Sequence, residues 1–434
     1  MNISTLKRRM TLGLVLSTAS AALAQSDSPA RPQPRDASFI QQALDDAAAR
    51  GGLVRLEAGT YDLNAPLSVP EGVTLAGVWE SPHHAQLERG TVFSVTAGHG
   101  QDDEKPLVML NPSSTIKGIT FFYPRQRVPD TVAYPWTIQG RGMHCSVIDC
   151  TFVNAYKAID FGTHHNELHY IRNCFGCPLK IGVFVDRCTD IGRIENVHFN
   201  PHYWMRAGAP GTPEWPVLSK YLWENLIAFE FARTDWEYVC NTFCYGARIG
   251  YRFYQSRHGA ANGNFLGIGA DWCHRALVVE QSQPPGLLIT NGEFVGGTGG
   301  HALMEVTPRH NGVVQLANCS FWGPCEVSAI LDGNGTTSLS QCNFLNQVRE
   351  PSGAHLVQAL GGDLIVQACR FGLDAPAIHL GEKVKTAVIM GNRFTGRKLI
   401  DNRSSGDVQE GLNVVSRPPS RPAAPTASAP APSR

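Results

Sequence analysis

The sequence of 434 residues has no excess of charge of either sign, because 37 Lys and Arg side chains are balanced by 37 Asp and Glu side chains. Nucleic acids and anionic membrane surfaces attract proteins that concentrate positive charge, so this balance argues against both as partners. Long apolar runs are also missing, since the stretch at 10–22 is shorter than the roughly 20 residues that a membrane-spanning helix needs. We therefore predict neither nucleic-acid binding nor a membrane span.

The N-terminus has the features of a secretory signal peptide. Residues 7–9 are Lys-Arg-Arg, residues 10–22 are apolar, and Ala-Leu-Ala at 22–24 fits a small-residue cleavage site. We therefore predict a signal peptide over 1–24, a linker over 25–35, and a secreted or periplasmic protein. The arginine pair also allows export by the twin-arginine route.

The C-terminal segment 417–434 is rich in Pro, Ala and Ser and has no apolar period. This composition predicts a disordered tail. Between the linker and this tail, residues 36–416 contain no comparable break. We expect them to form one domain with an insertion at 200–225.

A short motif that ends in Phe recurs along this domain. A polar residue or Gly opens most copies, and Cys often stands two positions before the Phe. Successive copies lie roughly 20–30 residues apart, with one longer gap at the insertion, and such a period indicates a solenoid of stacked repeats. The copies are 149–152, 173–175, 196–199, 241–243, 263–265, 292–294, 318–321, 341–344, 368–371 and 391–394.

The segments between the motifs are short, rich in β-branched and aromatic residues, and bounded by Gly and Asn. These features favour strands over helices. One rung cannot bury its apolar face alone, so stacked rungs must share one core. The repeats therefore predict a parallel β-helix.

The sequence contains 12 cysteines, five of which belong to the motif. We expect these five to stack in the interior as small apolar residues, although export would also permit local disulfides. The pairs at 174/177 and 240/244 have no further Cys or His at zinc-site spacing, so no metal site is predicted. The motif cysteines are Cys150, Cys174, Cys319, Cys342 and Cys369.

The start of the domain has the most specific pattern. Residues 36–50 predict an amphipathic helix with Phe39, Leu44 and Ala47 on one face, and Gly-Gly at 51–52 ends it. Then follow Gly-Gly-x-Val-x-Leu-x-Ala-Gly-x-Tyr and Pro-x-Gly-Val-x-Leu-x-Gly. This order resembles the opening of the pectate-lyase-like right-handed β-helix superfamily, which includes rhamnogalacturonases, polygalacturonases and pectate lyases.

The resemblance implies an all-β fold, a single-stranded, right-handed parallel β-helix with an N-terminal capping helix. It also implies carbohydrate-active chemistry, although the same fold serves epimerases, phage tailspikes and adhesins. The polygalacturonase motif Asn-Thr-Asp is not intact, and Arg-His-Gly at 257–259 matches the motif Gly-His-Gly only loosely.

Each motif is followed by a second strand whose second and fourth residues are expected to point inward and whose third residue points to solvent. Stacking places the third residues of successive rungs about 4.8 Å apart. The segments are 158–161, 182–185, 228–231, 250–253, 276–279, 302–305, 329–332 and 377–380. The predicted outward column is Asp160, Phe184, Glu230, Arg252 and Val278, and the next one is Gly162, Asp186, Ala232, Tyr254 and Glu280.

Ionisable residues gather in these columns, although like charges at adjacent strand positions repel. We take Asp186, Glu230 and Asp160 as candidate catalytic residues, the alternative being a solvated face with incidental ion pairs. The candidate substrate-binding residues come from the columns, the loops after them and the Trp-rich insertion, whose tryptophans alternatively only hold the loop. They are Arg252, Tyr254, His258, Arg257, Asp190, Asp235, Trp204, Trp215, Trp223 and Trp236, with His164 and His165 nearby.

Two carboxylates across a groove can hydrolyse a glycosidic bond. Asp186 and Glu230 are expected roughly 8 Å apart, and Asp160 and Glu230 roughly 9–10 Å, from strand spacing and rise. Both separations fit inversion better than retention. We therefore favour a glycoside hydrolase, which needs no cofactor, acting on a poly- or oligosaccharide.

Two other functions stay open. A uronate lyase would use Ca²⁺ held by aspartates with an arginine as base, and Asp160, Asp186, Asp190 and Arg252 could be recruited to that scheme. A non-catalytic carbohydrate-binding or adhesin-like β-helix would need neither a carboxylate pair nor calcium.

Overall fold

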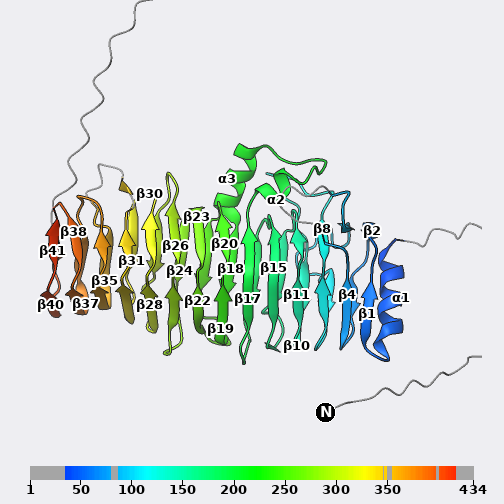
Figure 1. The fold of residues 1–434 in the computed structure, drawn as a ribbon, viewed down its shortest axis with the longest axis horizontal. Coiled ribbons are helices and arrows are strands. Elements are labelled where there is room, and N and C mark those ends of the chain that lie inside the picture. The colour runs from blue at the N-terminus through cyan, green and yellow to red at the C-terminus, as the bar shows by residue number, and fades with distance from the viewer. Residues whose placement is uncertain (1–34, 80–86, 346, 349–353, 397–399, 417–434) are drawn as a thin grey trace, which may run out of the picture. The chain divides into compact units, whose positions relative to one another are not determined.

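The computed structural model describes residues 35–79, 87–345, 347–348, 354–396 and 400–416, which belong to one unit. Parallel strands stack rung upon rung into a β-solenoid of about 14 turns, with the helix α1 (Ala37–Ala48) at its N-terminal end (Figure 1). This confirms the predicted parallel β-helix with an N-terminal helix. The predicted signal peptide, nearly all of the linker and the predicted tail lie outside the described residues.

Each rung contributes to three ladders of parallel strands, which we call the first, second and third ladder. The first ladder contains β1 (Gly52–Arg55), β4 (Val73–Ala76), β7 (Thr115–Lys117), β11 (Ser146–Ile148), β15 (Tyr170–Gly176), β17 (Arg193–Phe199), β19 (Thr234–Cys240), β22 (Ala261–Leu266), β25 (Leu287–Thr290), β28 (Val313–Ala317), β32 (Thr336–Ser340), β35 (Val357–Gln367), β37 (Ile378–Met390) and β40 (Asp407–Gly411).

The long strands pass through a corner and therefore serve two ladders. The second ladder contains the ends of β15 and β17 together with β2 (Gly59–Leu63), β5 (Thr91–Val95), β8 (Ile119–Phe122), β12 (Thr151–Phe152), β20 (Phe243–Tyr245), β23 (Gly269–Cys273), β26 (Glu293–Gly296), β29 (Ser320–Trp322), β33 (Asn343–Phe344), β36 (Arg370–Phe371), β38 (Arg393–Thr395) and β41 (Val414–Ser416).

The third ladder carries most of the candidate site. It contains the beginnings of β35 and β37 together with β3 (Leu67–Val69), β6 (Val108–Leu110), β9 (Trp136–Gly140), β13 (Lys157–Phe161), β16 (Ile181–Val185), β18 (Ile227–Phe231), β21 (Ile249–Phe253), β24 (Arg275–Val279), β27 (Ala302–Val306), β31 (Val327–Leu331) and β39 (Ile400–Asn402). Two short pairs complete the strands, β10 (Gly142–Met143) with β14 (Asn166–Glu167) and β30 (Pro324–Cys325) with β34 (Gln347–Val348).

The polar residue of the motif forms the corner between the first and second ladders. Asn173 and Asn196 both have a φ of +51°, in the left-handed region that Asn tolerates better than most residues. Their side chains also connect the rungs, because Asn173 Nδ2 donates to Asp149 Oδ1 at 3.0 Å and Asn196 Nδ2 donates to Asn173 Oδ1 at 2.9 Å. The motif therefore sets the direction of the chain as well as its packing.

The motif phenylalanines stack inside the second ladder. The ring of Phe344 lies parallel to those of Phe321 and Phe371, with centroid distances of 4.9 Å on both sides. Five motif cysteines are also buried, as predicted, and burial raises the pKa of the Cys150 thiol to about 12. None of the 12 cysteines, all of which lie in the described part of the chain, forms a disulfide.

Three copies of the motif were aligned wrongly. Phe175 and Phe243 point outward, because Gly176 and Cys244 occupy the inward position in their rungs. Phe265 belongs to β22 of the first ladder. A slip of one residue moves a side chain to the opposite face of a strand, so a shortened motif no longer marks the same position.

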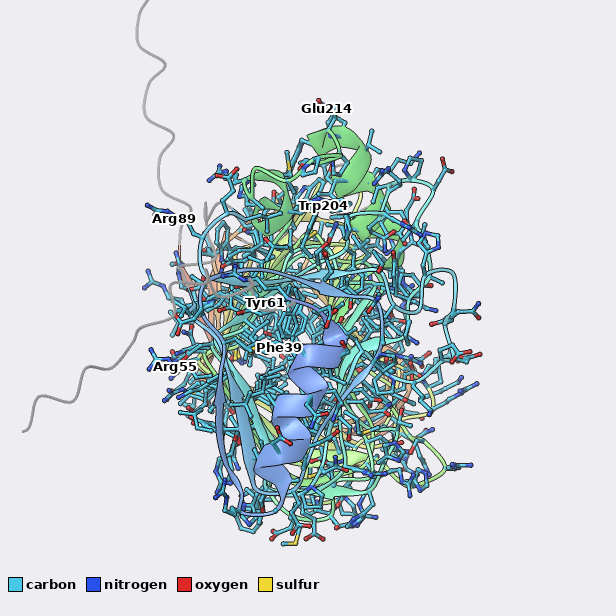
Figure 2. All side chains as sticks on the ribbon, turned by 90° about the vertical axis from the view of Figure 1, so that its right-hand side faces the viewer. Phe39, Arg55, Tyr61, Arg89, Trp204 and Glu214 are labelled. Carbon is cyan, nitrogen blue, oxygen red and sulfur yellow. The ribbon has the colours of Figure 1, made fainter. Side chains whose placement is uncertain are left out.

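The helix α1 covers the first rungs. Asp36 caps it by accepting a hydrogen bond from the Phe39 amide at 3.0 Å, while Ile40 and Leu44 are fully buried. Figure 2 shows α1 lying across the end of the stack. The insertion contains α2 (His202–Met205) and α3 (Trp215–Asn225), which stand out from the row of rungs in Figure 1. No helix in the described ranges is long and apolar enough to cross a membrane.

The Phe stack gives a stability prediction. Replacing Phe344 by Ala should lower the free energy of unfolding by about 3–5 kcal/mol, because the neighbouring rungs cannot close the cavity. Urea unfolding followed by circular dichroism measures this loss. Replacing Trp322, which is 43% exposed, by Ala is the control and should change stability by no more than about 0.5 kcal/mol. Equal losses in the two variants would contradict the stacking role.

Candidate functional site

The third ladder brings the predicted outward column together. Asp160 pairs with Phe184, Phe184 with Glu230, and Glu230 with Arg252 in successive rungs. Val278 follows Arg252, so the predicted order is confirmed. The alignment of the next two segments was wrong by one residue, since Glu305 and then Ile330 continue the column.

Asp160 does not face solvent as predicted. It is fully buried, its Oδ1 accepts hydrogen bonds from the amides of Gly162 and Thr163 at 2.6 and 2.9 Å, and its Oδ2 accepts one from Gln139. The carboxylate therefore satisfies the backbone donors of the turn that follows β13. These contacts assign Asp160 to the scaffold and leave no oxygen directed at a substrate.

Asp186 follows β16 directly and is 5% exposed. Its Oδ1 accepts hydrogen bonds from the amides of Arg187 and Arg233 at 2.7 and 2.9 Å, and from Ser256 Oγ at 3.0 Å. Among the described residues, none donates to its Oδ2. Three donors on one oxygen fix the orientation of the carboxylate and leave the other oxygen available.

Glu230 and Arg252 form an ion pair on adjacent rungs. Arg252 Nη1 donates to Glu230 Oε1 at 2.6 Å, and its Nε donates to Glu280 Oε1 at 2.7 Å. The guanidinium also lies 4.5 Å from the centre of the Tyr254 ring. We call Asp186, Glu230, Arg252, Tyr254 and Glu280 the acidic cluster.

Burial sets the acidity within the cluster. It raises the pKa of Glu230, and the positive charge of Arg252 opposes this only in part. Burial also raises the pKa of Tyr254, and the negative charges of Glu230 and Asp186 add to that effect. Burial therefore favours the protonated form of Glu230.

A cavity of about 410 Å³ opens beside the acidic cluster. Glu280 of the cluster lines this cavity, and so does Ser256, which donates to Asp186 Oδ1. The predicted Arg257 also lines it and donates from Nε to His258 Nε2 at 3.0 Å. The lining residues are Gln255, Ser256, Arg257, Glu280, Gln281 and Arg309.

The remaining loop residues lie outside this cluster. Asp235 forms an ion pair with Arg233, whose amide donates to Asp186, so it contacts the cluster only through that arginine. Asp190 and Trp236 are exposed, the latter by 57%. His164 hydrogen-bonds to Gln139 and His165 to Thr189.

The tryptophans of the insertion are not beside the acidic cluster as predicted. Trp204 is 1% exposed and belongs to the core, so it offers no face to a sugar. In Figure 2, Trp204 lies closer to the rungs than Glu214, which is at the outer end of the insertion. Trp215 lies 6.1 Å from Tyr245, and Trp223 lies 4.7 Å from Trp272, between ring centres. Tyr245 and Trp272 belong to the second ladder.

Sequence reasoning missed several residues of the site. Ser256 and Arg233 orient Asp186, but they lie in loops where the repeat gives no register. Outside the acidic cluster, Asp271 of the second ladder pairs with Tyr245 beside Trp272, and burial raises the pKa of Asp271. The outward column of the second ladder would have revealed it.

Comparison with solved structures finds β-helical proteins of low sequence identity. The A-module of the mannuronan C-5 epimerase AlgE6 of Azotobacter vinelandii is 14% identical, over 88% of this chain and 95% of that one, with a TM-score of 0.40. The AlgE4 A-module of the same organism is 12% identical, over 88% and 95%, with a TM-score of 0.38. PfbA, a surface adhesin of Streptococcus pneumoniae, is 11% identical, over 88% of both chains, with a TM-score of 0.35.

No protein-family model and no curated protein matches the sequence.

The assignment of Asp160 to the scaffold is testable. Asp160→Ala should lower the free energy of unfolding by about 1–3 kcal/mol, because the amides of Gly162 and Thr163 and the side chain of Gln139 lose their acceptor. Thermal unfolding measures the effect. The exposed Asp190, replaced by Ala, serves as the comparison and should change stability by less than about 0.5 kcal/mol. A fully stable Asp160→Ala protein would contradict the assignment.

Proposed function

We propose that the protein is a carbohydrate-active enzyme that hydrolyses glycosidic bonds of a poly- or oligosaccharide with inversion of configuration. The observation that carries the proposal is the pair Asp186 and Glu230, two carboxylates on adjacent rungs beside a cavity. Strand spacing and rise separate their Cα atoms by roughly 8 Å. Inverting enzymes hold their two carboxyl groups about 6.5–9.5 Å apart, whereas retaining enzymes hold them about 5–5.5 Å apart.

Glu230 is the proposed general acid. Such a group must be protonated at the pH at which it donates, and burial raises the pKa of Glu230 in that direction. Arg252 limits this rise because it favours the carboxylate. In the reaction Glu230 would give its proton to the leaving oxygen of the glycosidic bond and become a carboxylate paired with Arg252.

Asp186 is the proposed general base. Its Oδ1 is held by three donors, and its Oδ2 would accept a proton from the water that attacks the anomeric carbon. Ser256 and the Arg233 amide are positioning groups, because they fix the carboxylate. The cavity side chains Gln255 and Arg309 offer hydrogen-bond partners to sugar hydroxyls.

A uronate lyase is the second candidate, favoured by the two arginines, Arg257 and Arg309, that line the cavity. Their positive charges could neutralise a uronate carboxylate. The described acids do not fit the calcium site considered for a lyase, since Asp160 is buried and hydrogen-bonded within the protein. Arg252 is likewise engaged by two glutamates.

Substitution of the two carboxylates tests the proposal. Asp186→Asn and Glu230→Gln should each lower kcat/KM by about 10²–10⁴-fold, the range for loss of a general acid or base. Release of reducing ends from a panel of plant and bacterial glycans measures activity, and NMR of the first-formed product gives its anomeric configuration. The exposed Glu293 of the second ladder provides the control Glu293→Gln, expected to keep full activity.

Full activity of both Asn and Gln variants would refute the site. Retention of configuration would refute the inverting mechanism. A product that absorbs in the ultraviolet through a new double bond would instead establish the lyase.

The pH dependence of kcat/KM gives an independent prediction. Activity should fall as pH rises through the pKa of Glu230, because the acid then loses its proton. Arg252 lowers that pKa, so Arg252→Gln should move the alkaline limb to higher pH. Loss of Arg252 also leaves the negative charge of Glu280 unopposed, which acts in the same direction. If the alkaline limb of the Arg252→Gln profile stays in place or moves to lower pH, Glu230 is ruled out as the acid.

A further inference from the structure

A second group of reactive side chains lies in the interior of the solenoid, in rungs that also carry residues of the acidic cluster. His169, Cys188 and Glu237 are fully buried, and one ligand atom of each lies within 4.8 Å of the others. They come from three consecutive rungs and take no part in the proposed hydrolysis. We propose that they bind a structural transition-metal ion, with Zn²⁺ as the expected metal.

Gly192 in the middle rung makes the approach of these ligands feasible. His169, Gly192 and Glu237 occupy equivalent positions, because they directly precede Tyr170, Arg193 and Tyr238, which pair with one another in β15, β17 and β19. A Cβ atom on Gly192 would lie 2.3 Å from His169 Nε2 and 2.4 Å from Glu237 Oε2. With no side chain there, His169 Nε2 and Glu237 Oε1 come within 3.0 Å across an intervening rung. That rung supplies Cys188 instead.

Two further residues hold the ligands in place. Asn166 donates through Nδ2 to three carbonyl oxygens, and its Oδ1 lies 2.9 Å from His169 Nδ1. Because an amide oxygen can only accept a hydrogen bond, His169 Nδ1 must carry the proton. His169 Nε2 is thereby left for a metal. Thr234 Oγ1 donates to Glu237 Oε2 at 2.6 Å. Hydrogen bonds of this kind ordinarily orient metal-binding histidines and carboxylates.

The donor set suits a divalent ion in an apolar interior. A thiolate, a carboxylate and a neutral imidazole around M²⁺ carry no net charge, which limits the cost of burial. Sulfur and imidazole donors favour zinc over calcium or magnesium. Binding would release the thiol proton of Cys188 and the proton shared by His169 and Glu237. Without a metal, His169 and Glu237 form a buried ion pair and Cys188 donates to the Asp190 carbonyl.

The proposed ion would link the rungs that hold the base of the acidic cluster. Asn166 Nδ2 donates to the Asp186 carbonyl at 3.0 Å, and the Cys188 amide donates to the Arg233 carbonyl at 3.1 Å. Arg233 in turn donates its amide to Asp186 Oδ1. The metal would therefore stabilise the segment that positions Asp186, whatever reaction the cluster performs.

Metal content and absorption spectroscopy test this inference. Full-length protein refolded with excess Zn²⁺ or Co²⁺, then freed of loose metal, should retain about one ion per chain. The Co²⁺ form should show thiolate-to-cobalt charge-transfer absorption in the near ultraviolet. Cys188→Ser should abolish this band. Cys174→Ser, a matched control at another fully buried cysteine, should preserve it.

A wild-type chain that retains less than about one-tenth of an ion would overturn the proposal, as would a charge-transfer band that survives in Cys188→Ser. If Cys188→Ser does not fold, the variant Thr234→Val tests the metal site in its place. This substitution keeps the shape of the side chain but removes the hydrogen-bond donor to Glu237. Its Co²⁺ affinity should be roughly 10–100-fold weaker, and an unchanged affinity would contradict the site. These readouts do not depend on hydrolase activity.

Discussion

In-register stacking of parallel rungs is the interaction on which the rest of this structure depends. Parallel strands pair about 4.8 Å apart, so each side chain meets its equivalents in the rungs before and after it. The same rule stacks the phenylalanines of the second ladder, links the corner residues Asn173 and Asn196, and pairs Glu230 with Arg252. Core, corner and candidate site are therefore products of one repeated geometry.

Buried ionisable side chains occur mainly in one limited stretch of the chain. Among the described residues, buried Asp, Glu, His and Lys side chains all lie between 157 and 237, apart from His310. Burial of such groups is costly unless each is paired or hydrogen-bonded. Here Asp160 and Asp186 accept hydrogen bonds from backbone amides, and Glu230 forms an ion pair with Arg252. Asp160 thus serves the scaffold, whereas Asp186 and Glu230 of the acidic cluster lie in the same stretch.

The sequence allowed the β-helix, its capping helix and the order of the outward column to be predicted, because each follows from local pattern and period. The prediction failed where the period slipped by one residue, as at Phe175 and Phe243, since no sequence signal separates a shortened motif from a complete one. It failed also for Trp204, because a Trp-rich insertion can face either a ligand or the core. The column of the candidate site was thus predictable, whereas the burial of Asp160 and the place of Trp204 were not.

Sequence alone determined the column that runs from Asp160 to Val278, since the period in that stretch assigns each residue to a rung. Only the tertiary structure decided which of those residues are covered, and by what. Asp160 and Asp186 differ in this respect. The Asp160 carboxylate accepts hydrogen bonds from the turn that follows it, whereas no donor among the described residues reaches Oδ2 of Asp186. The convergence of His169 and Glu237 was equally hidden, because it joins rungs two apart through a gap that Gly192 leaves. Contacts that skip a rung depend on the size of the side chain between, which the period does not specify.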